Sequence, residues 1–226
     1  MTIGRAFNGP PHSAHGGYAC AVFARASGLE PPVAVTLLAA PPLETPMAVA
    51  AVGKRVSVRA GDTLVATVSP ADRSPGAIPP VGLTTAQIAT RAFPGRTGHP
   101  FPNCFACGPN RTDGLHLAPG PVPGRPHTVA SPWTPRTDDP DMLWCVLDCP
   151  GGWVEGRPAP LVLSRLSIVI PGRVEPGTPH VVVAERLGVH GRTVSVGSSV
   201  HTPSGQLIAT AAAVWTAAPD GLRYSG

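Results

Sequence analysis

An arrangement that occurs twice along the chain constrains the fold more than any other feature of the sequence. Each half contains one apolar, helix-like segment, a Thr-Pro turn and several short strand-like segments. Short matches recur in the same order: Thr45-Pro46 with Thr178-Pro179, Val56-Ser57-Val58 with Val194-Ser195-Val196, and Leu64-Val65-Ala66-Thr67 with Leu207-Ile208-Ala209-Thr210. The repeat predicts an α+β protein with two antiparallel curved sheets, each wrapped around a central helix.

The second helix is predicted over residues 141–149 (DMLWCVLDC), where apolar residues recur at helical spacing. Proline and glycine at 150–152 end it, because proline cannot extend the helical hydrogen bonds and glycine tolerates the turn that follows. Asp148 lies near its far end. A carboxylate on a buried helix is unfavourable unless it is paired or hydrogen-bonded, so Asp148 is a candidate for catalysis or ligand contact.

The first helix is predicted from Tyr18 to Ser27, with Gly28 as its C-terminal cap. A short helical turn is expected at 84–91. Alternation and β-branched residues predict the strands, which cover residues 33–38, 47–52, 55–59, 63–68, 159–170, 181–187, 192–201 and 206–216. The chain then divides into an N-terminal unit (1–75), a proline-rich connector (76–126) that carries Cys104 and Cys107, and a C-terminal unit (127–226).

Composition argues against several classes of protein. The net charge is +4, yet no basic run or aromatic-basic stripe occurs, so no nucleic-acid partner is expected. Apolar runs are too short for a membrane span and the first residues lack a signal pattern, which predicts a cytoplasmic protein without a membrane partner. Five cysteines, an odd number, favour reduced thiols over a disulfide framework.

Three segments resemble a known family. Residues 8–17, ending in His15-Gly16-Gly17, resemble the Asn-loop-His-Gly-Gly segment at the helix start of hotdog-fold acyl-thioesterases. Residues 191–211 are similar to the closing hairpin of that fold. Residues 99–109 (HPFPNCFACGP) together with 147–153 (LDCPGGW) resemble double-hotdog thioesterase-like proteins. The resemblance covers nearly the whole chain and implies a double hotdog, two hotdog units in one chain.

The resemblance also implies a site between the two central helices. The start of the first helix would supply Gly17 N–H to a thioester carbonyl, and the second helix would supply Asp148 as general base, with Asn8 and His15 assisting. The first helix has no acid at the matching position, and the second begins with Pro140-Asp141-Met142 instead of His-Gly-Gly. One competent site is therefore expected. Its candidate substrate contacts are Gly16, Tyr18, Trp144 and Cys149.

Each candidate also has a purely structural interpretation. Gly16-Gly17 could be only a tight helix start, Asp148 could cap the following turn, and Trp144 could be core or rim packing. Cys149 next to Asp148 is a weak nucleophile candidate, because a helix C-terminus disfavours a thiolate.

No metal is required, and Cys104-x-x-Cys107 is only half of a zinc site. Its missing ligands would be Cys145 with Cys149, or His99 with His116. The alternative is a compact turn with two reduced thiols.

The sequence therefore predicts a thioesterase-like protein that hydrolyses an acyl thioester and needs no cofactor. Its small-molecule substrate would be an acyl-CoA, or the acyl group would be presented on an acyl carrier protein. A dehydratase or hydratase acting on 3-hydroxyacyl or enoyl thioesters is one alternative, because His15 and Asp148 could form an acid–base pair. A non-catalytic binder of a hydrophobic ligand is the other. One chain already supplies both halves of the site, so the protein could be a monomer or a homodimer.

Overall fold

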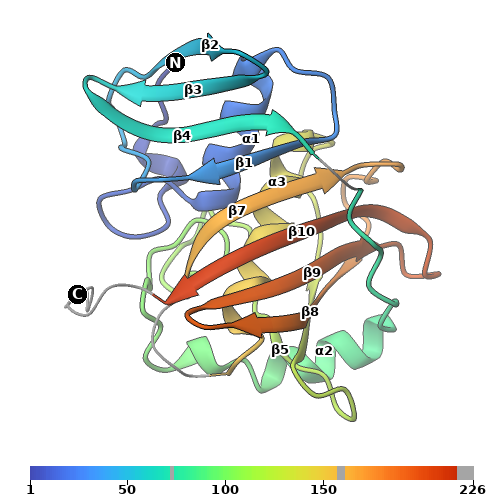
Figure 1. The fold of residues 1–226 in the computed structure, drawn as a ribbon. Coiled ribbons are helices and arrows are strands. Elements are labelled where there is room, and N and C mark those ends of the chain that lie inside the picture. Colours follow the sequence, from blue (N-terminus) through green and yellow to red (C-terminus); the bar gives the residue numbers. More distant parts are fainter. Residues whose placement is uncertain (72–73, 157–160, 218–226) are drawn as a thin grey trace.

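A single ten-stranded antiparallel sheet organises the computed structural model, which describes residues 1–71, 74–156 and 161–217. The strands follow one another across the sheet in the order β2 (Ala48–Val52), β3 (Arg55–Ala60), β4 (Thr63–Pro70), β1 (Val33–Leu37), β7 (Leu161–Val169), β10 (Leu207–Ala217), β9 (Thr193–His201), β8 (His180–His190), β6 (Thr128–Trp133) and β5 (Gly120–Pro121). Figure 1 shows the four N-terminal strands, β1 to β4, at one end of this sheet, and β7, β10, β9 and β8 following them in that order.

Two helices, α1 (Gly16–Ser27) and α3 (Pro140–Asp148), pack against each other and against the sheet (Figure 1). Helix α1 contacts β1, β4 and β7, whereas α3 contacts β7, β8, β9 and β10. The main core lies between these helices and the sheet and contains Phe23, Leu143 and Leu166. The predicted α+β class is confirmed, with helices buried because each packs between its partner helix and the strands.

The two predicted sheets are in fact one, which corrects that part of the prediction. Strands β1 and β7 pair antiparallel, with Ala34 opposite Ser167 and Thr36 opposite Arg165. The Arg165 guanidinium also donates a hydrogen bond to Thr36 Oγ1 at 2.7 Å. Residues far apart in sequence therefore join the two halves, and strand patterning alone carries no information about such a pairing.

Strand β6 is the largest element that the sequence pattern missed. Its residues include Pro132, and proline within a run argues against a central strand. The structure accommodates it because β6 lies next to the edge and is followed only by the two-residue β5.

The ends of the helices follow ordinary capping rules. Gly28 adopts the left-handed conformation (φ 65°) and ends α1, as predicted. Helix α3 begins with Pro140 at its first position and Asp139 as N-cap, whose side chain accepts the Asp141 N–H at 2.9 Å. The α-helix ends at Asp148, and the chain continues as the 3₁₀ helix η3 (Cys149–Trp153).

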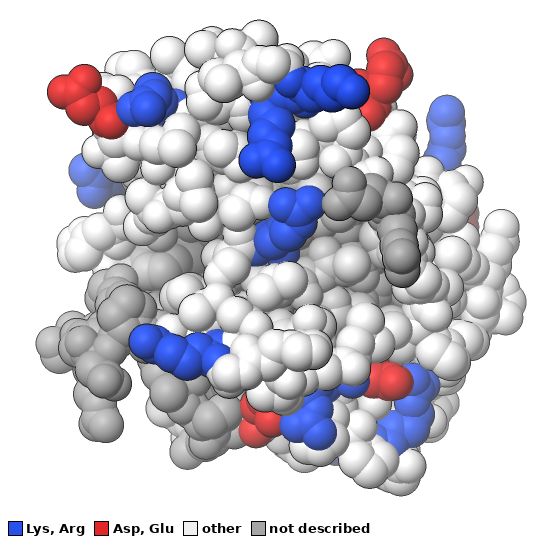
Figure 2. Space-filling model, in the orientation of Figure 1, with Lys and Arg blue, Asp and Glu red and all other residues white. Residues whose placement is uncertain are grey.

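The connector contains η2 (Pro94–Arg96) and helix α2 (Leu83–Arg91), which matches the predicted turn at 84–91 and packs against β6 and β8. A further 3₁₀ turn, η1 (Arg5–Phe7), precedes α1. No helix in the described ranges is long and apolar enough to cross a membrane. The face in Figure 2 is mostly uncharged, with a few separate basic side chains.

Candidate functional site

The start of α1 meets the end of α3 at one very close contact. The Gly17 N–H donates a hydrogen bond to Asp148 Oδ2 at 2.7 Å. A Cβ atom at Gly17 would collide with the Trp144 carbonyl oxygen and would lie 2.7 Å from Asp148 Cβ. Glycine is therefore required for the approach of the two helices, and this approach places the carboxylate at the amides of the first turn.

Most backbone donors in the first turn of α1 already have an acceptor. His15 is the N-cap, and its Nδ1 accepts the Tyr18 N–H at 3.3 Å. The sequence predicted that Gly17 N–H would donate to the thioester, but in the structure it donates its hydrogen bond to Asp148 instead. Gly16 N–H remains, because the first residue of a helix has no acceptor within the helix.

A cavity of about 860 Å³ opens at this junction. His15 and Gly16 from the start of α1 and Asp148 and Cys149 from the end of α3 contribute to its wall. Much of the remaining wall is apolar and comes from the connector, η3, β7 and the end of β10, including Phe101, Trp153, Leu161, Leu163 and Trp215. A cavity with few polar groups at one end has the character of a small-molecule site.

Asp148 is 2% exposed, and its two oxygens have different surroundings. Oδ2 accepts the Gly17 N–H and lies 3.6 Å from His15 Nε2. Oδ1 is buried without a hydrogen-bond partner among the described residues. Burial raises the pKa of Asp148 to about 6, against the opposing effects of the His15 charge and the Gly17 hydrogen bond. The carboxylate is therefore mostly ionised at pH 7.

His15 is 3% exposed and lies among groups that favour its protonated form. Burial alone lowers its pKa, but hydrogen bonds with Cys104 and Cys145 and the negative charges of Cys104 and Asp148 outweigh burial. The resulting pKa of His15 lies well above its usual value. When the ring is protonated, His15 no longer accepts the Tyr18 N–H, and its charge favours the ionised form of Asp148.

Three thiols gather beside His15 at the cavity wall. Hydrogen bonds from Cys107 and Cys149 lower the pKa of the Cys104 thiol well below its usual value. Burial raises the pKa of the Cys149 thiol well above its usual value, which disfavours the thiolate form. All five cysteines are free thiols.

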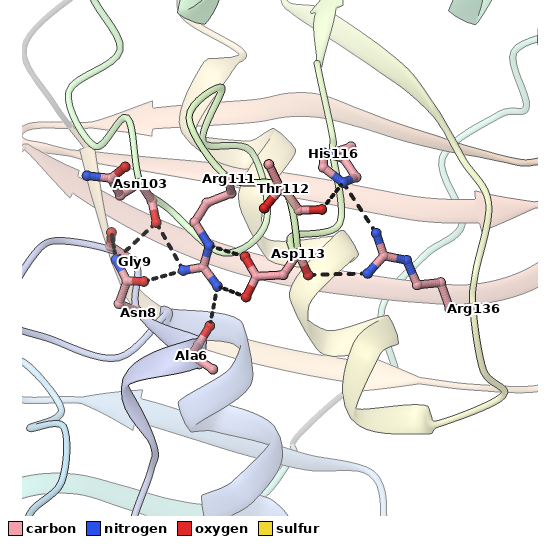
Figure 3. Close-up of polar contacts among 9 residues, drawn as sticks. All are labelled: Ala6, Asn8, Gly9, Asn103, Arg111, Thr112, Asp113, His116 and Arg136. Carbon is pink, nitrogen blue, oxygen red and sulfur yellow. Dashed lines mark hydrogen bonds and ion pairs between the residues drawn. The ribbon is translucent and has the colours of Figure 1, made fainter.

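Of the two ligand pairs proposed from sequence for Cys104 and Cys107, one member of each lies nearby. Cys149 interacts with both thiols, and His99 Nε2 lies 3.3 Å from Cys107 Sγ. Cys145 Sγ donates to the Asp141 carbonyl and also interacts with His15, but no hydrogen bond joins it to Cys104 or Cys107 among the described residues. His116 is an exposed-loop residue that contacts the Thr112 carbonyl and Arg136, outside the cavity wall (Figure 3).

Asn8 does not line the cavity; its side chain holds two loops together. Its Nδ2 donates to the carbonyls of Gly9 and Asn103, and its Oδ1 accepts from Arg111 at 2.6 Å. Arg111 also bonds the Ala6 carbonyl (Figure 3). All the polar atoms of the Asn8 side chain are engaged, so the structure gives it a positioning role instead of the predicted contact with water or substrate.

Replacing Arg111 with methionine should destabilise the fold by about 1–3 kcal/mol, because Asn8 Oδ1 would remain buried without a donor. Chemical denaturation of the purified variant measures the change. Arg136→Met is the matched control, since that side chain makes only exposed contacts of 3.4 Å in the same network and should change stability by less than about 0.5 kcal/mol. Equal effects of the two substitutions would contradict the assigned role.

Two of the predicted substrate contacts lie elsewhere. The Tyr18 ring stacks on Phe7 with centroids 3.8 Å apart, and Trp144 is buried in the core. Neither residue belongs to the cavity wall, whereas Gly16 and Cys149 do. Sequence reasoning missed Arg192, which lies at the wall far from both motifs in sequence, and the apolar residues of β7. No local pattern distinguishes these positions from ordinary strand and loop residues.

Comparison with solved structures identifies the fold. A candidate thioesterase from Novosphingobium aromaticivorans superposes with a TM-score of 0.61 at 15% identity, covering 96% of this chain and 94% of that one. A hot dog fold protein of unknown function from Alicyclobacillus acidocaldarius gives a TM-score of 0.55 at 14% identity over 90% and 87% of the two chains. The chain has the hotdog fold. In each comparison the similarity extends over most of this chain and most of the compared chain.

A third hotdog relative is the acyl-CoA thioesterase II TesB2 of Mycobacterium marinum, with a TM-score of 0.54 at 13% identity over 92% of this chain and 91% of that one. No family model matches this sequence, and no curated protein sequence matches it. At such low identities the likeness establishes the hotdog fold alone.

The opposite end of the helix pair in this hotdog protein has different chemistry. There Arg25, near the end of α1, forms an ion pair with Asp141, near the start of α3. This end of the helix pair is therefore joined by an ion pair, whereas the end at Gly17 and Asp148 is joined by a hydrogen bond from a backbone amide to a carboxylate.

Proposed function

We propose that this hotdog protein hydrolyses an acyl thioester in the cavity between the start of α1 and the end of α3. The observation that carries the proposal is the buried Asp148, held by Gly17 N–H through Oδ2 while Oδ1 has no partner among the described residues. A buried carboxylate oxygen without a donor is unfavourable unless a ligand or water satisfies it. Its position at a largely apolar cavity suits a water molecule that attacks a bound acyl group.

In the proposed reaction, Asp148 acts as the base for hydrolysis. Its Oδ1 accepts a proton from water as the water oxygen attacks the thioester carbonyl carbon. Gly16 N–H, at the positive end of α1, stabilises the negative charge that develops on the carbonyl oxygen. The carbon–sulfur bond then breaks, and Asp148 returns the proton to the departing sulfur. The hydrogen bond that Asp148 Oδ2 accepts from Gly17 N–H favours the ionised carboxylate at the start of the cycle.

The apolar part of the cavity would hold the acyl chain, and Arg192 is the cation at the wall that could bind the phosphates of coenzyme A. Among the described residues, the one hydrogen bond of its side chain is long, from Nη2 to the Ala217 carbonyl at 3.5 Å, and no carboxylate of these residues pairs with it. Two other loop arginines are already paired: Arg111 bonds Asn8 in the loop network, and Arg125 bonds Glu185.

Replacing Arg192 with alanine should raise KM for an acyl-CoA about tenfold and leave kcat nearly unchanged, because the lost contact lies away from the reacting carbonyl. The same acyl group on N-acetylcysteamine, which has no phosphates, should show no change in KM. Steady-state kinetics on both substrates measures the difference. Arg59→Ala, on β3, is the control and should behave like the wild type.

The direct test of the function is a panel of acyl-CoA esters of increasing chain length, followed by detection of the released thiol. Turnover by the wild type that exceeds the buffer blank supports the proposal. Ligand binding without release of thiol on any ester, measured by calorimetry, would contradict hydrolysis and favour the non-catalytic binder. Acyl groups on a carrier protein form a second arm of the same assay.

A second candidate is hydration or dehydration of the acyl chain, because His15 Nε2 and Asp148 Oδ2 lie 3.6 Å apart and could act as an acid–base pair. Incubation with a 3-hydroxyacyl-CoA and an enoyl-CoA distinguishes the two reactions. Hydrolysis releases free coenzyme A, whereas the alternative changes absorption of the conjugated double bond and leaves the thioester intact.

The proposal includes the organisation of the chain as a double hotdog. Residues 1–75 would form the first unit, 76–126 the connector and 127–226 the second unit, with the site shared between units. Support comes from the two helices, one in each half, and from the β1–β7 junction in the middle of the sheet. We also propose a cytoplasmic location, because five free thiols are compatible with a reducing compartment.

A further inference from the structure

We propose that Cys104, Cys107, Cys149 and His15 bind a zinc ion at the wall of the cavity. The potential ligand atoms of His15, Cys104 and Cys149 all lie within 4.8 Å of one another, and all three residues are buried. Cys104 and Cys107 Sγ are 3.9 Å apart. Two thiolates bound to one tetrahedral zinc at about 2.3 Å lie about 3.8 Å apart, so these two sulfurs already have the required spacing.

The segment from Cys104 to Cys107 has the rigid geometry that such a site needs. The Gly108 N–H donates to the Cys104 carbonyl at 2.9 Å and closes the turn. A Cβ atom at Gly108 would lie 2.6 Å from that same carbonyl oxygen, so only glycine fits. Phe105 N–H donates to the Asn8 carbonyl at 2.8 Å, which fixes the turn against the segment that leads to His15.

The fourth ligand, His15, approaches from the start of α1, and Cys149 approaches from the end of α3. The thiols of Cys107 and Cys149 also interact, so the sulfurs form one group. The ligand atoms of His15, Cys104 and Cys149 lie within 4.8 Å of one another, so they need to move together by no more than about 1 Å to reach tetrahedral zinc spacing, and Cys107 joins them through its 3.9 Å contact with Cys104. Binding through His15 Nε2 places a proton on Nδ1 and ends the 3.3 Å hydrogen bond from Tyr18 N–H.

His99 lies where it can donate a hydrogen bond to one of the sulfur ligands. Its Nδ1 accepts the Phe101 N–H at 2.9 Å, so in the neutral ring Nε2 carries the proton. Nε2 lies 3.3 Å from Cys107 Sγ and can donate to that sulfur. Donors to ligand sulfurs are typical of metal sites and stabilise thiolates. The zinc would tie the connector to both helices, independently of whether Asp148 catalyses hydrolysis.

The test is the metal content of the full chain, purified under reducing conditions and incubated with zinc(II). We expect about one zinc per chain by mass spectrometry. With cobalt(II) in place of zinc, we expect the intense visible bands of a tetrahedral ion and a thiolate charge-transfer band in the near ultraviolet. Wild-type protein that binds no zinc, or cobalt spectra of a six-coordinate ion, would overturn the proposal.

Variants assign the ligands. Cys104→Ser, Cys107→Ser and Cys149→Ser should each lose zinc or bind it at least 100-fold more weakly, whereas Cys20→Ser, a buried thiol in α1, should bind like the wild type. Equal loss in Cys20→Ser would overturn the assignment. Asp148→Asn should retain zinc whatever its hydrolytic activity, which separates this proposal from the proposed function.

The two histidines are distinguished in the same way. His15→Gln should lose the tetrahedral cobalt spectrum, and His99→Gln should keep it with an affinity about 10–100-fold lower. The reverse result would overturn the choice of His15. Circular dichroism of each variant establishes that it is folded, and the cobalt spectrum of the wild type tests the site even if a cysteine variant does not fold.

Discussion

Replacing Asp148 with asparagine should lower kcat for acyl-thioester hydrolysis by about 10²–10⁴-fold while leaving affinity for a non-hydrolysable thioether analogue nearly unchanged. Asparagine has almost the same shape, and its amide oxygen can still accept the Gly17 N–H that now bonds Asp148 Oδ2. It cannot accept a proton from water. Initial rates from thiol detection and calorimetry with the analogue measure the two quantities.

Asp141→Asn provides the matched control, because Asp141 is a buried acid on the same helix at the other end. It should keep nearly full turnover and lose only the ion pair with Arg25. Turnover by Asp148→Asn within a few fold of the wild type would eliminate Asp148 as the base. Loss of analogue binding in that variant would indicate a structural effect instead of a chemical one.

Gly17→Ala should destabilise the protein by about 3 kcal/mol and lower Tm by roughly 10 °C. The added methyl group would collide with the Trp144 carbonyl oxygen and press on Asp148 Cβ, and backbone atoms of a packed helix cannot move aside as a flexible side chain can. Any folded fraction should also have weaker turnover, since Asp148 would shift from the Gly17 amide. Thermal unfolding by circular dichroism measures the first effect.

Gly76→Ala is the control for this substitution, because a Cβ atom there meets no atom within 4 Å. It should change Tm by no more than a few degrees. A Gly17→Ala variant as stable as Gly76→Ala would mean that α1 and α3 do not approach each other as closely as described here.

The parts of the fold that depend on local chemistry could be predicted from the sequence. Gly28 marks the end of α1, and the strands follow from alternation and β-branched residues. Strand β6 was missed because Pro132 obscures it, and the β1–β7 pairing depends on contacts between residues more than 120 positions apart, such as Thr36 and Arg165.

The candidate site could likewise be predicted only in part from the sequence. The resemblance led to Asp148 and the Gly16-Gly17 turn, and the structure brings these residues together. It could not reveal that Asp148 accepts the hydrogen bond of the Gly17 amide, or that Arg111 donates a hydrogen bond to the Asn8 side chain. Both facts depend on which of several neighbouring polar groups pair in three dimensions, and residue type does not determine that choice.

The ion pair between Arg25 and Asp141 bears on how the double hotdog proposed above, with two similar halves in one chain, changes over time. In an assembly of two identical subunits, every substitution appears at both ends of the helix pair, so a change that strengthens one end alters the other as well. Joining the halves in one polypeptide removes that coupling. Under this proposed organisation, substitutions can stabilise the Arg25–Asp141 end of the helix pair without changing the other end, where the proposed site at Asp148 and Gly17 lies.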